Sequence, residues 1–134
     1  MQNIETIQQA KIIKQLLGDV ASIAIVGLSP KENRPSNMVA RYLIDAGYTV
    51  YPVNPGQNQI LEQKCYPDLL SIPNPIDIVN IFRRSEDTLQ IVEQALECQP
   101  LPKAIWMQQE IVNNEAADIA INKGIYVVMD RCIK

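Results

Sequence analysis

The feature that most constrains the fold is a series of five short apolar segments separated by amphipathic stretches. Each apolar segment holds four to six residues, several of them β-branched, and has almost no polar interruption. Such segments are typical of strands covered on both faces within a parallel sheet. The predicted strands are Ser22–Val26, Thr49–Val53, 76–81, Ala104–Met107 and 126–129.

The stretches between the strands repeat apolar residues at three- and four-residue steps, which is typical of amphipathic helices. Ser36 is placed to cap the second of these helices. The segment between the second and third strands carries Pro67, Pro73 and Pro75, so we expect a loop there with at most a short helix. The predicted helices cover residues 4–17, 37–46, 86–97 and 114–123.

This alternation predicts an α/β fold with an open, Rossmann-like parallel sheet of five strands and helices on both faces. No internal repeat or linker divides the chain, so residues 1–134 are predicted to form a single domain. Right-handed crossovers favour the strand order 3-2-1-4-5, and the order 2-1-3-4-5 stays open. In both orders a ligand would bind at the carboxyl ends of the strands.

The composition excludes several function classes. The chain has no histidine, so it cannot build a Ser-His-Asp triad or a His-ligated metal site. Its three cysteines form no CxxC pair, and neither a disulfide framework nor a metal site is expected. With 12 basic and 15 acidic residues the net charge is −3, which gives no reason to expect nucleic-acid or membrane binding.

The longest nearly apolar run covers residues 20–28 and is far shorter than a membrane helix. The first residues also lack the apolar core of a signal peptide. Together with the unpaired cysteines, these observations predict a cytoplasmic protein.

A polar loop follows the first strand and leads directly into a predicted helix. It contains Gly27, Ser29, Lys31, Arg34 and Ser36. A glycine, two hydroxyls, two cations and a helix N-terminus are the groups that bind phosphate. An ordinary solvated turn capped by Ser36 explains the same residues equally well. The loop lacks the GxGxxG pattern of dinucleotide-binding enzymes.

The other strand ends are also polar. Asn54 and Pro55 follow the second strand, where they either border a ligand or initiate a turn. Arg83 and Arg84 follow the third strand, and one of them should face the ligand crevice while the other faces solvent or a carboxylate. Four cations therefore gather at one edge of an acidic chain, which favours a polyanionic small molecule as ligand.

Six segments of the chain have a recognisable order and spacing: IAIVGLSPKENRPS, YPVNPGQ, KCYPDL, IDIVNIFRRSE, IWMQQEIVNNEAA and VVMDRCIK. In these segments the chain resembles the small stand-alone CoA-binding domain proteins of bacteria and archaea. These proteins are relatives of the CoA-binding domain of succinyl-CoA synthetase α subunits. The resemblance covers about residues 12–134 and implies a Rossmann-like fold with coenzyme A as ligand.

The resemblance also implies which residues hold the ligand. The loop after the first strand would hold the CoA phosphates, the second and third strand ends would border the nucleotide, and the fourth would lie toward the pantetheine arm. Gly56-Gln57 stands where a related ligase domain offers a lysine. The implied site residues, with the loop cation Lys31, are Gly27, Leu28, Ser29, Lys31, Arg34, Ser36, Asn54, Pro55, Phe82, Arg83, Met107 and Gln108.

We therefore expect a protein that binds CoA or an acyl-CoA through its strand ends and has no catalytic residues of its own. One alternative is an NAD(P)-dependent oxidoreductase on the same fold. Another is a thiol-based redox or regulatory module, in which Cys65 or Cys132 forms a mixed disulfide with CoA. The expected partner is the CoA molecule itself, with a weak homo-oligomer or an unidentified partner enzyme left open.

Overall fold

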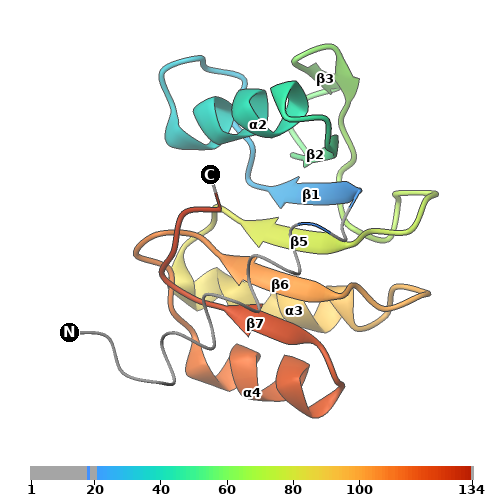
Figure 1. The fold of residues 1–134 in the computed structure, drawn as a ribbon, viewed down its shortest axis with the longest axis vertical. Helices are drawn as coiled ribbons and strands as arrows, with labels where there is room; N and C mark the ends of the chain where they lie inside the picture. Colours follow the sequence, from blue (N-terminus) through green and yellow to red (C-terminus); the bar gives the residue numbers. More distant parts are fainter. Residues whose placement is uncertain (1–17, 19–20, 134) are drawn as a thin grey trace.

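A five-stranded parallel sheet forms the centre of the molecule (Figure 1). The computed structural model describes Gly18 and residues 21–133, so the helix predicted for residues 4–17 lies outside the described part. Three predicted strands are confirmed at both ends, and the other two are shorter than predicted. The strands of the sheet are β1 (Ser22–Val26), β2 (Thr49–Val53), β5 (Ile78–Ile81), β6 (Ala104–Met107) and β7 (Tyr126–Val128).

The order of the strands is β2-β1-β5-β6-β7, which is 2-1-3-4-5 when the sheet strands are counted along the chain. The order 3-2-1-4-5, favoured by sequence, is therefore wrong. The reason lies on the outer edge of β2, where Tyr66 forms a parallel bridge with Val53 and its N–H donates to the carbonyl of Pro52 at 2.9 Å. Since that edge is occupied, β5 pairs with the opposite edge of β1.

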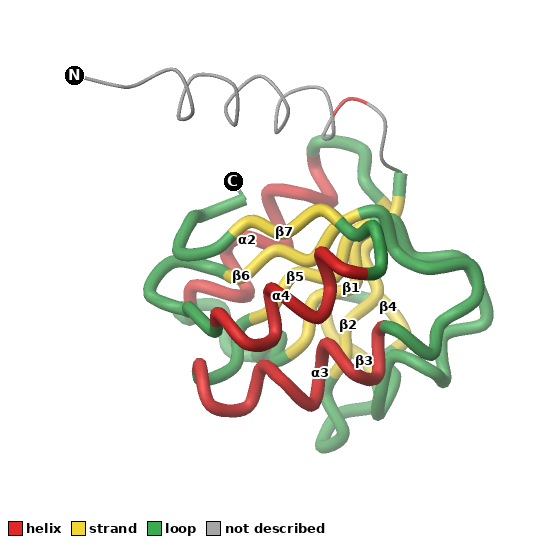
Figure 2. Tube along the Cα trace, turned by 90° about the horizontal axis from the view of Figure 1, so that it is seen from below, coloured by secondary structure: helices red, strands yellow, loops and turns green. Residues whose placement is uncertain are grey.

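Helices cover both faces of the sheet, as predicted (Figure 2). Helix α2 (Pro35–Asp45) covers one face, whereas α3 (Thr88–Ala95) and α4 (Asn114–Asn122) cover the other. A 3₁₀ turn, η1 (Ser85–Asp87), leads into α3, so the start of the helix predicted at residue 86 is not α-helical. None of the described helices is long and apolar enough to span a membrane.

Both faces of β1 are buried, which explains why its sequence is apolar without alternation. Ile23 and Ile25 pack in the core beneath α2, and Ala24 and Val26 pack in the core beneath α3 and α4. Two cores of ordinary apolar packing therefore hold the carboxyl ends of the strands in place.

A short hairpin, β3 (Gln59–Ile60) with β4 (Gln63–Lys64), lies within the segment predicted as a loop. Its two-residue turn places Leu61 and Glu62 at φ +53° and +64°. Hairpin turns with two positive φ angles normally use Asn or Gly, and this sequence has neither at the turn. The usual sequence signal of a hairpin was therefore absent.

Asp77 joins the start of β5 to the start of β1. Its Oδ2 accepts hydrogen bonds from the N–H groups of Ala21 at 2.7 Å and Ser22 at 3.1 Å, and Lys103 Nζ lies 3.6 Å from its Oδ1. Burial acts to raise the pKa of Asp77, but these hydrogen bonds and Lys103 outweigh it, so the pKa lies below its usual value.

Because the folded-state pKa of Asp77 is lowered, its contribution to stability is complete above the unfolded pKa of about 4. That contribution is lost as the pH falls through the folded value. We expect Asp77→Asn to lower the free energy of unfolding by about 1–2 kcal/mol near pH 7, with a smaller loss at acid pH. Urea unfolding between acid pH and pH 7 measures the change in the free energy of unfolding. Asp118→Asn, at an exposed position, is the control. An equal effect of both variants at all pH values would contradict the assignment.

Candidate functional site

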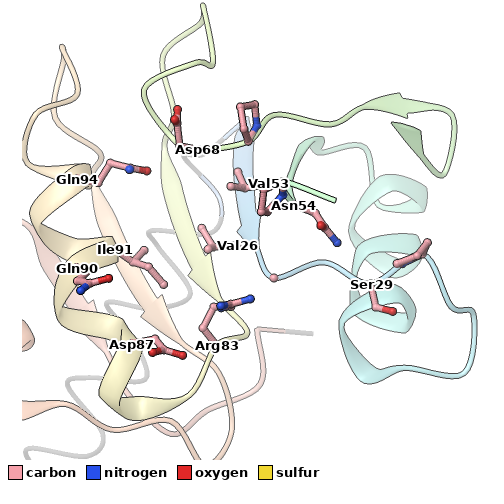
Figure 3. A pocket seen from close by; sticks show the side chains of 14 residues that line it. Val26, Ser29, Val53, Asn54, Asp68, Arg83, Asp87, Gln90, Ile91 and Gln94 are labelled. Atoms are coloured by element: carbon pink, nitrogen blue, oxygen red, sulfur yellow. The ribbon is translucent and has the colours of Figure 1, made fainter. Parts of the chain in front are cut away.

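Three adjoining clefts lie along the carboxyl ends of the sheet strands. The first has a volume of about 390 Å³ and is closed on one side by α3 and on the other by the loops after β1 and β2 (Figure 3). Its lining mixes apolar strand ends with polar side chains. The lining residues are Val26, Gly27, Ser29, Pro30, Val53, Asn54, Pro55, Pro67, Asp68, Arg83, Asp87, Gln90, Ile91 and Gln94.

The second cleft, of about 380 Å³, lies between the loop after β1 and the start of α2. It shares Gly27 and Ser29 with the first cleft and adds two cations, Lys31 and Arg34. Ser36 and Phe82 also line it, so most of the predicted phosphate-binding residues are brought together here.

Side-chain hydrogen bonds hold the loop after β1 in its conformation. The N–H of Ser29 donates to Ser36 Oγ at 3.0 Å, and Asn37 Nδ2 donates to the carbonyl of Ser29 at 2.9 Å. The N–H of Lys31 donates to Ser29 Oγ at 3.1 Å. Ser36 is therefore not the N-cap predicted from sequence, because Pro35 starts the helix and the N-cap residue is Arg34. The Ser36 hydroxyl instead fixes the loop.

Gly27 lies where the loop passes closest to the end of β5. Its φ is +90°, and its N–H donates to the carbonyl of Val53 at 3.0 Å. A Cβ at this position would lie 2.5 Å from the carbonyl oxygen of Phe82 and 2.9 Å from Arg83 Cδ. Only glycine fits, because the two strand ends meet here without room for a side chain.

Asn54 connects the loops after β1 and β2. Its Nδ2 donates to the carbonyl of Leu28 at 2.9 Å, and its Oδ1 accepts from the N–H of Gly56 at 2.9 Å. The amide therefore positions both loops that border the first cleft. Pro55 lines that cleft beside it.

The two adjacent arginines after β5 differ in their surroundings. Arg84 is exposed, and its Nε lies 3.1 Å from Asp87 Oδ2 and 3.5 Å from Glu86 Oε1. Arg83 lines the first cleft (Figure 3) and has no ion-pair or hydrogen-bond partner among the described residues. Its guanidinium charge is therefore available to a ligand.

The third cleft is the largest, at about 730 Å³, and lies on the α2 side of the strand ends. It shares Pro35 and Phe82 with the second cleft and Arg83 with the first. Gln108 lines it with a side chain that is almost fully buried. The remaining lining residues are Val39, Arg84, Ser85, Gln109, Glu110, Ile111 and Cys132.

Two of the predicted site residues have side chains in the core. Leu28 packs beneath α2, and Met107 packs against the α3 and α4 side of the sheet. Both side chains are fully buried and line none of the three clefts. Only the backbone of these two residues lies near the site.

A model of the family described as "CoA binding domain" matches residues 21–134. The chain belongs to this CoA-binding domain family. The match covers β1 through β7 and all three clefts, so the strand-end site lies wholly within the CoA-binding domain.

The relatives include both stand-alone domains and parts of larger enzymes. YneT of Bacillus subtilis, an uncharacterized protein, is 44% identical over 122 residues, which cover 91% of this chain and 89% of YneT. A solved structure of a hypothetical protein from Pyrococcus horikoshii is 40% identical with a TM-score of 0.87, covering 92% of this chain and 85% of that one.

An enzyme of Archaeoglobus fulgidus named acetate–CoA ligase (ADP-forming) I is also similar. It is 39% identical over 72 residues, which are 54% of this chain. They make up only 10% of the ligase, so the likeness concerns one domain of that enzyme.

The part of the first cleft that α3 forms was not predicted from sequence. Asp87, Gln90 and Gln94 line the first cleft from η1 and α3, and Asp68 lines it from the opposite side. Their signal was the polar stripe of a helix that begins directly after a cationic strand end. From sequence alone, that polar stripe cannot be distinguished from the solvent-exposed face of an ordinary amphipathic helix.

Proposed function

We propose that this domain binds coenzyme A or an acyl-CoA in the three clefts at the carboxyl ends of its strands. The observation that carries the proposal is the position of Arg83. This cation lines both the first and the third clefts of an acidic chain and has no ion-pair partner among the described residues. Because Arg83 is exposed and has no carboxylate partner in the described part of the chain, its guanidinium can pair with a bound phosphate without breaking an existing ion pair. Membership in the CoA-binding domain family supports the same ligand.

Each of the three clefts has side chains suited to a different part of CoA. The nucleotide would occupy the first cleft, beside Asn54 and Pro55. Phosphates would meet Lys31, Arg34 and the loop after β1 in the second cleft. The pantetheine arm, with its two amides and its thiol, would lie in the third cleft beside Gln108.

We further propose that binding, without turnover, is the function of the domain itself. The chain holds no histidine, and the cleft residues with assigned roles are lysine, arginine, serine, asparagine and glutamine, which bind phosphates and amides. None of them forms a nucleophile with an adjacent general base. The nicotinamide-dependent enzyme stays as an outcome of the test below.

Thermal unfolding with added ligands tests the proposal. A ligand that binds only the folded state, at about 100 times its Kd, stabilises that state by about 2.7 kcal/mol. For a domain of this size CoA should therefore raise the Tm by roughly 10 °C. NADH, NADPH and adenosine at equal concentration should shift it much less. No shift with about millimolar CoA would overturn the proposal, and a larger shift with NADH would favour the oxidoreductase.

A further inference from the structure

The third cleft contains a thiol that the proposed CoA-binding function does not use. Cys132 lines this cleft, is half-buried and forms no disulfide. It shares the cleft with Phe82 and Gln108, and the proposed pantetheine arm would end in this space.

Hydrogen bonds fix the C-terminal segment that carries Cys132 along the end of β6. Trp106 Nε1 donates to the carbonyl of Arg131 at 2.7 Å, and the N–H of Ile133 donates to Gln108 Oε1 at 3.4 Å. The residues on both sides of Cys132 are therefore tied to the sheet. This places the thiol at the wall of the cleft rather than on a loose end.

Gln108 gives an independent sign that the third cleft is built for a ligand. Its side chain is only 4% exposed, and its Oε1 accepts from Asn80 Nδ2 at 3.1 Å and from the N–H of Ile133. Gln108 lines the third cleft, and its Nε2 is not among the buried polar atoms without a partner, so this group is open to the cleft. Nε2 has no partner among the described residues. A buried amide with an unused donor favours a ligand carbonyl at this point.

The other two cysteines lie outside the third cleft, and the pKa of each is raised. Cys65 is in the core beneath α2, and burial raises the pKa of its thiol. Cys98 lies near the amino ends of the strands, and burial together with Glu97 raises the pKa of its thiol. A raised pKa lowers the thiolate fraction, and thiolate is the reactive form.

We propose that Cys132 forms a reversible mixed disulfide with CoA held in the third cleft. This inference rests on the proposed CoA-binding function. The oxidant is CoA disulfide. The Cys132 thiolate attacks one sulfur of its S–S bond, the bond breaks, and a Cys132–CoA disulfide forms. The second CoA leaves as a thiolate and takes up a proton from water. Arg83 and the cations of the adjoining second cleft would attract the anionic CoA disulfide to this thiol.

Intact-mass spectrometry after incubation with CoA disulfide tests the proposal. The expected product is a single adduct of one CoA minus two hydrogens, removed by a reducing agent. Trypsin cleaves after Arg131, so peptide mapping of the natural sequence assigns the adduct to Cys132 without any variant. Cys98→Ser should carry the same adduct and Cys132→Ser none.

The rate of reaction separates a bound ligand from a merely accessible thiol. Because binding places the two sulfurs together, CoA disulfide should react at least about tenfold faster than glutathione disulfide. Equal rates, no adduct, or an adduct on Cys65 or Cys98 would overturn the inference. If CoA also failed to raise the Tm, the proposed function itself would fall. A CoA-induced Tm shift without an adduct would reject only the disulfide.

Discussion

Replacement of Gly27 by alanine is expected to destabilise the domain by about 3 kcal/mol, which lowers its Tm by roughly 10 °C. Two costs combine. The φ of +90° disfavours any residue with a Cβ, and the added Cβ would lie 2.5 Å from the carbonyl oxygen of Phe82. Because the oxygen belongs to the backbone of a buried strand end, it cannot move aside without disturbing β5. Thermal and urea unfolding measure both quantities.

Gly124→Ala is the matched control for this prediction. Gly124 has a similar φ of +83°, but a Cβ there would meet no atom within 4 Å. The control therefore carries the conformational cost alone, about 1–2 kcal/mol. The difference between the two variants isolates the close contact at the site. If both variants lost the same stability, the contact between Gly27 and the end of β5 would not constrain the fold.

The positions of the strands could be predicted because each is a local pattern. A buried parallel strand needs a short apolar run bounded by polar or glycine residues, and Ser22–Val26 has this pattern within ten residues. The order of the strands depends instead on contacts distant in sequence. Tyr66 occupies the outer edge of β2, and Asp77 bonds to the N–H groups of Ala21 and Ser22. No local pattern records either contact.

The clustering of the strand-end loops that form the proposed site was predictable for a different reason. Parallel strands bring their carboxyl ends to one edge in any order, so the error in strand order left the loops after β1, β2 and β5 together. The direction of individual side chains was less predictable. Met107 ends a strand that is buried on both faces, so alternation does not indicate whether its side chain meets the ligand or the core. The structure places it in the core.

The structure was also needed to show which of the two adjacent arginines lines the first cleft. Ser85 starts a 3₁₀ turn that brings Asp87 back to Arg84, so Arg84 lines the third cleft as an ion-paired side chain. Arg83 lines both the first and the third clefts and has no ion-pair partner among the described residues. The sequence predicted that one arginine would face the crevice and the other solvent or a carboxylate, but it did not indicate which was which. The difference between them provides a matched pair of variants.

Arg83→Gln is expected to weaken CoA binding about 10-fold to 100-fold. A hydrogen bond from a guanidinium to a phosphate contributes about 1.5–3 kcal/mol, and the variant removes both the charge and the paired donors. Because Arg83 has no carboxylate partner among the described residues, its removal leaves no buried charge unpaired, so the Tm without ligand should change little. Isothermal titration calorimetry with CoA measures the change in Kd.

Arg84→Gln is the control, because it changes the same charge one residue along the chain at a side chain that is 75% exposed and paired with Asp87. Its Kd for CoA should change less than about twofold, since exposed ion pairs contribute little. Raising the salt concentration should weaken CoA binding to the unchanged protein, because salt screens the interaction of a cation with phosphate. The difference in Kd between the unchanged protein and Arg83→Gln should therefore become smaller at high salt. Equal losses in the two variants would mean that net charge, rather than the position of Arg83 between the clefts, determines CoA affinity.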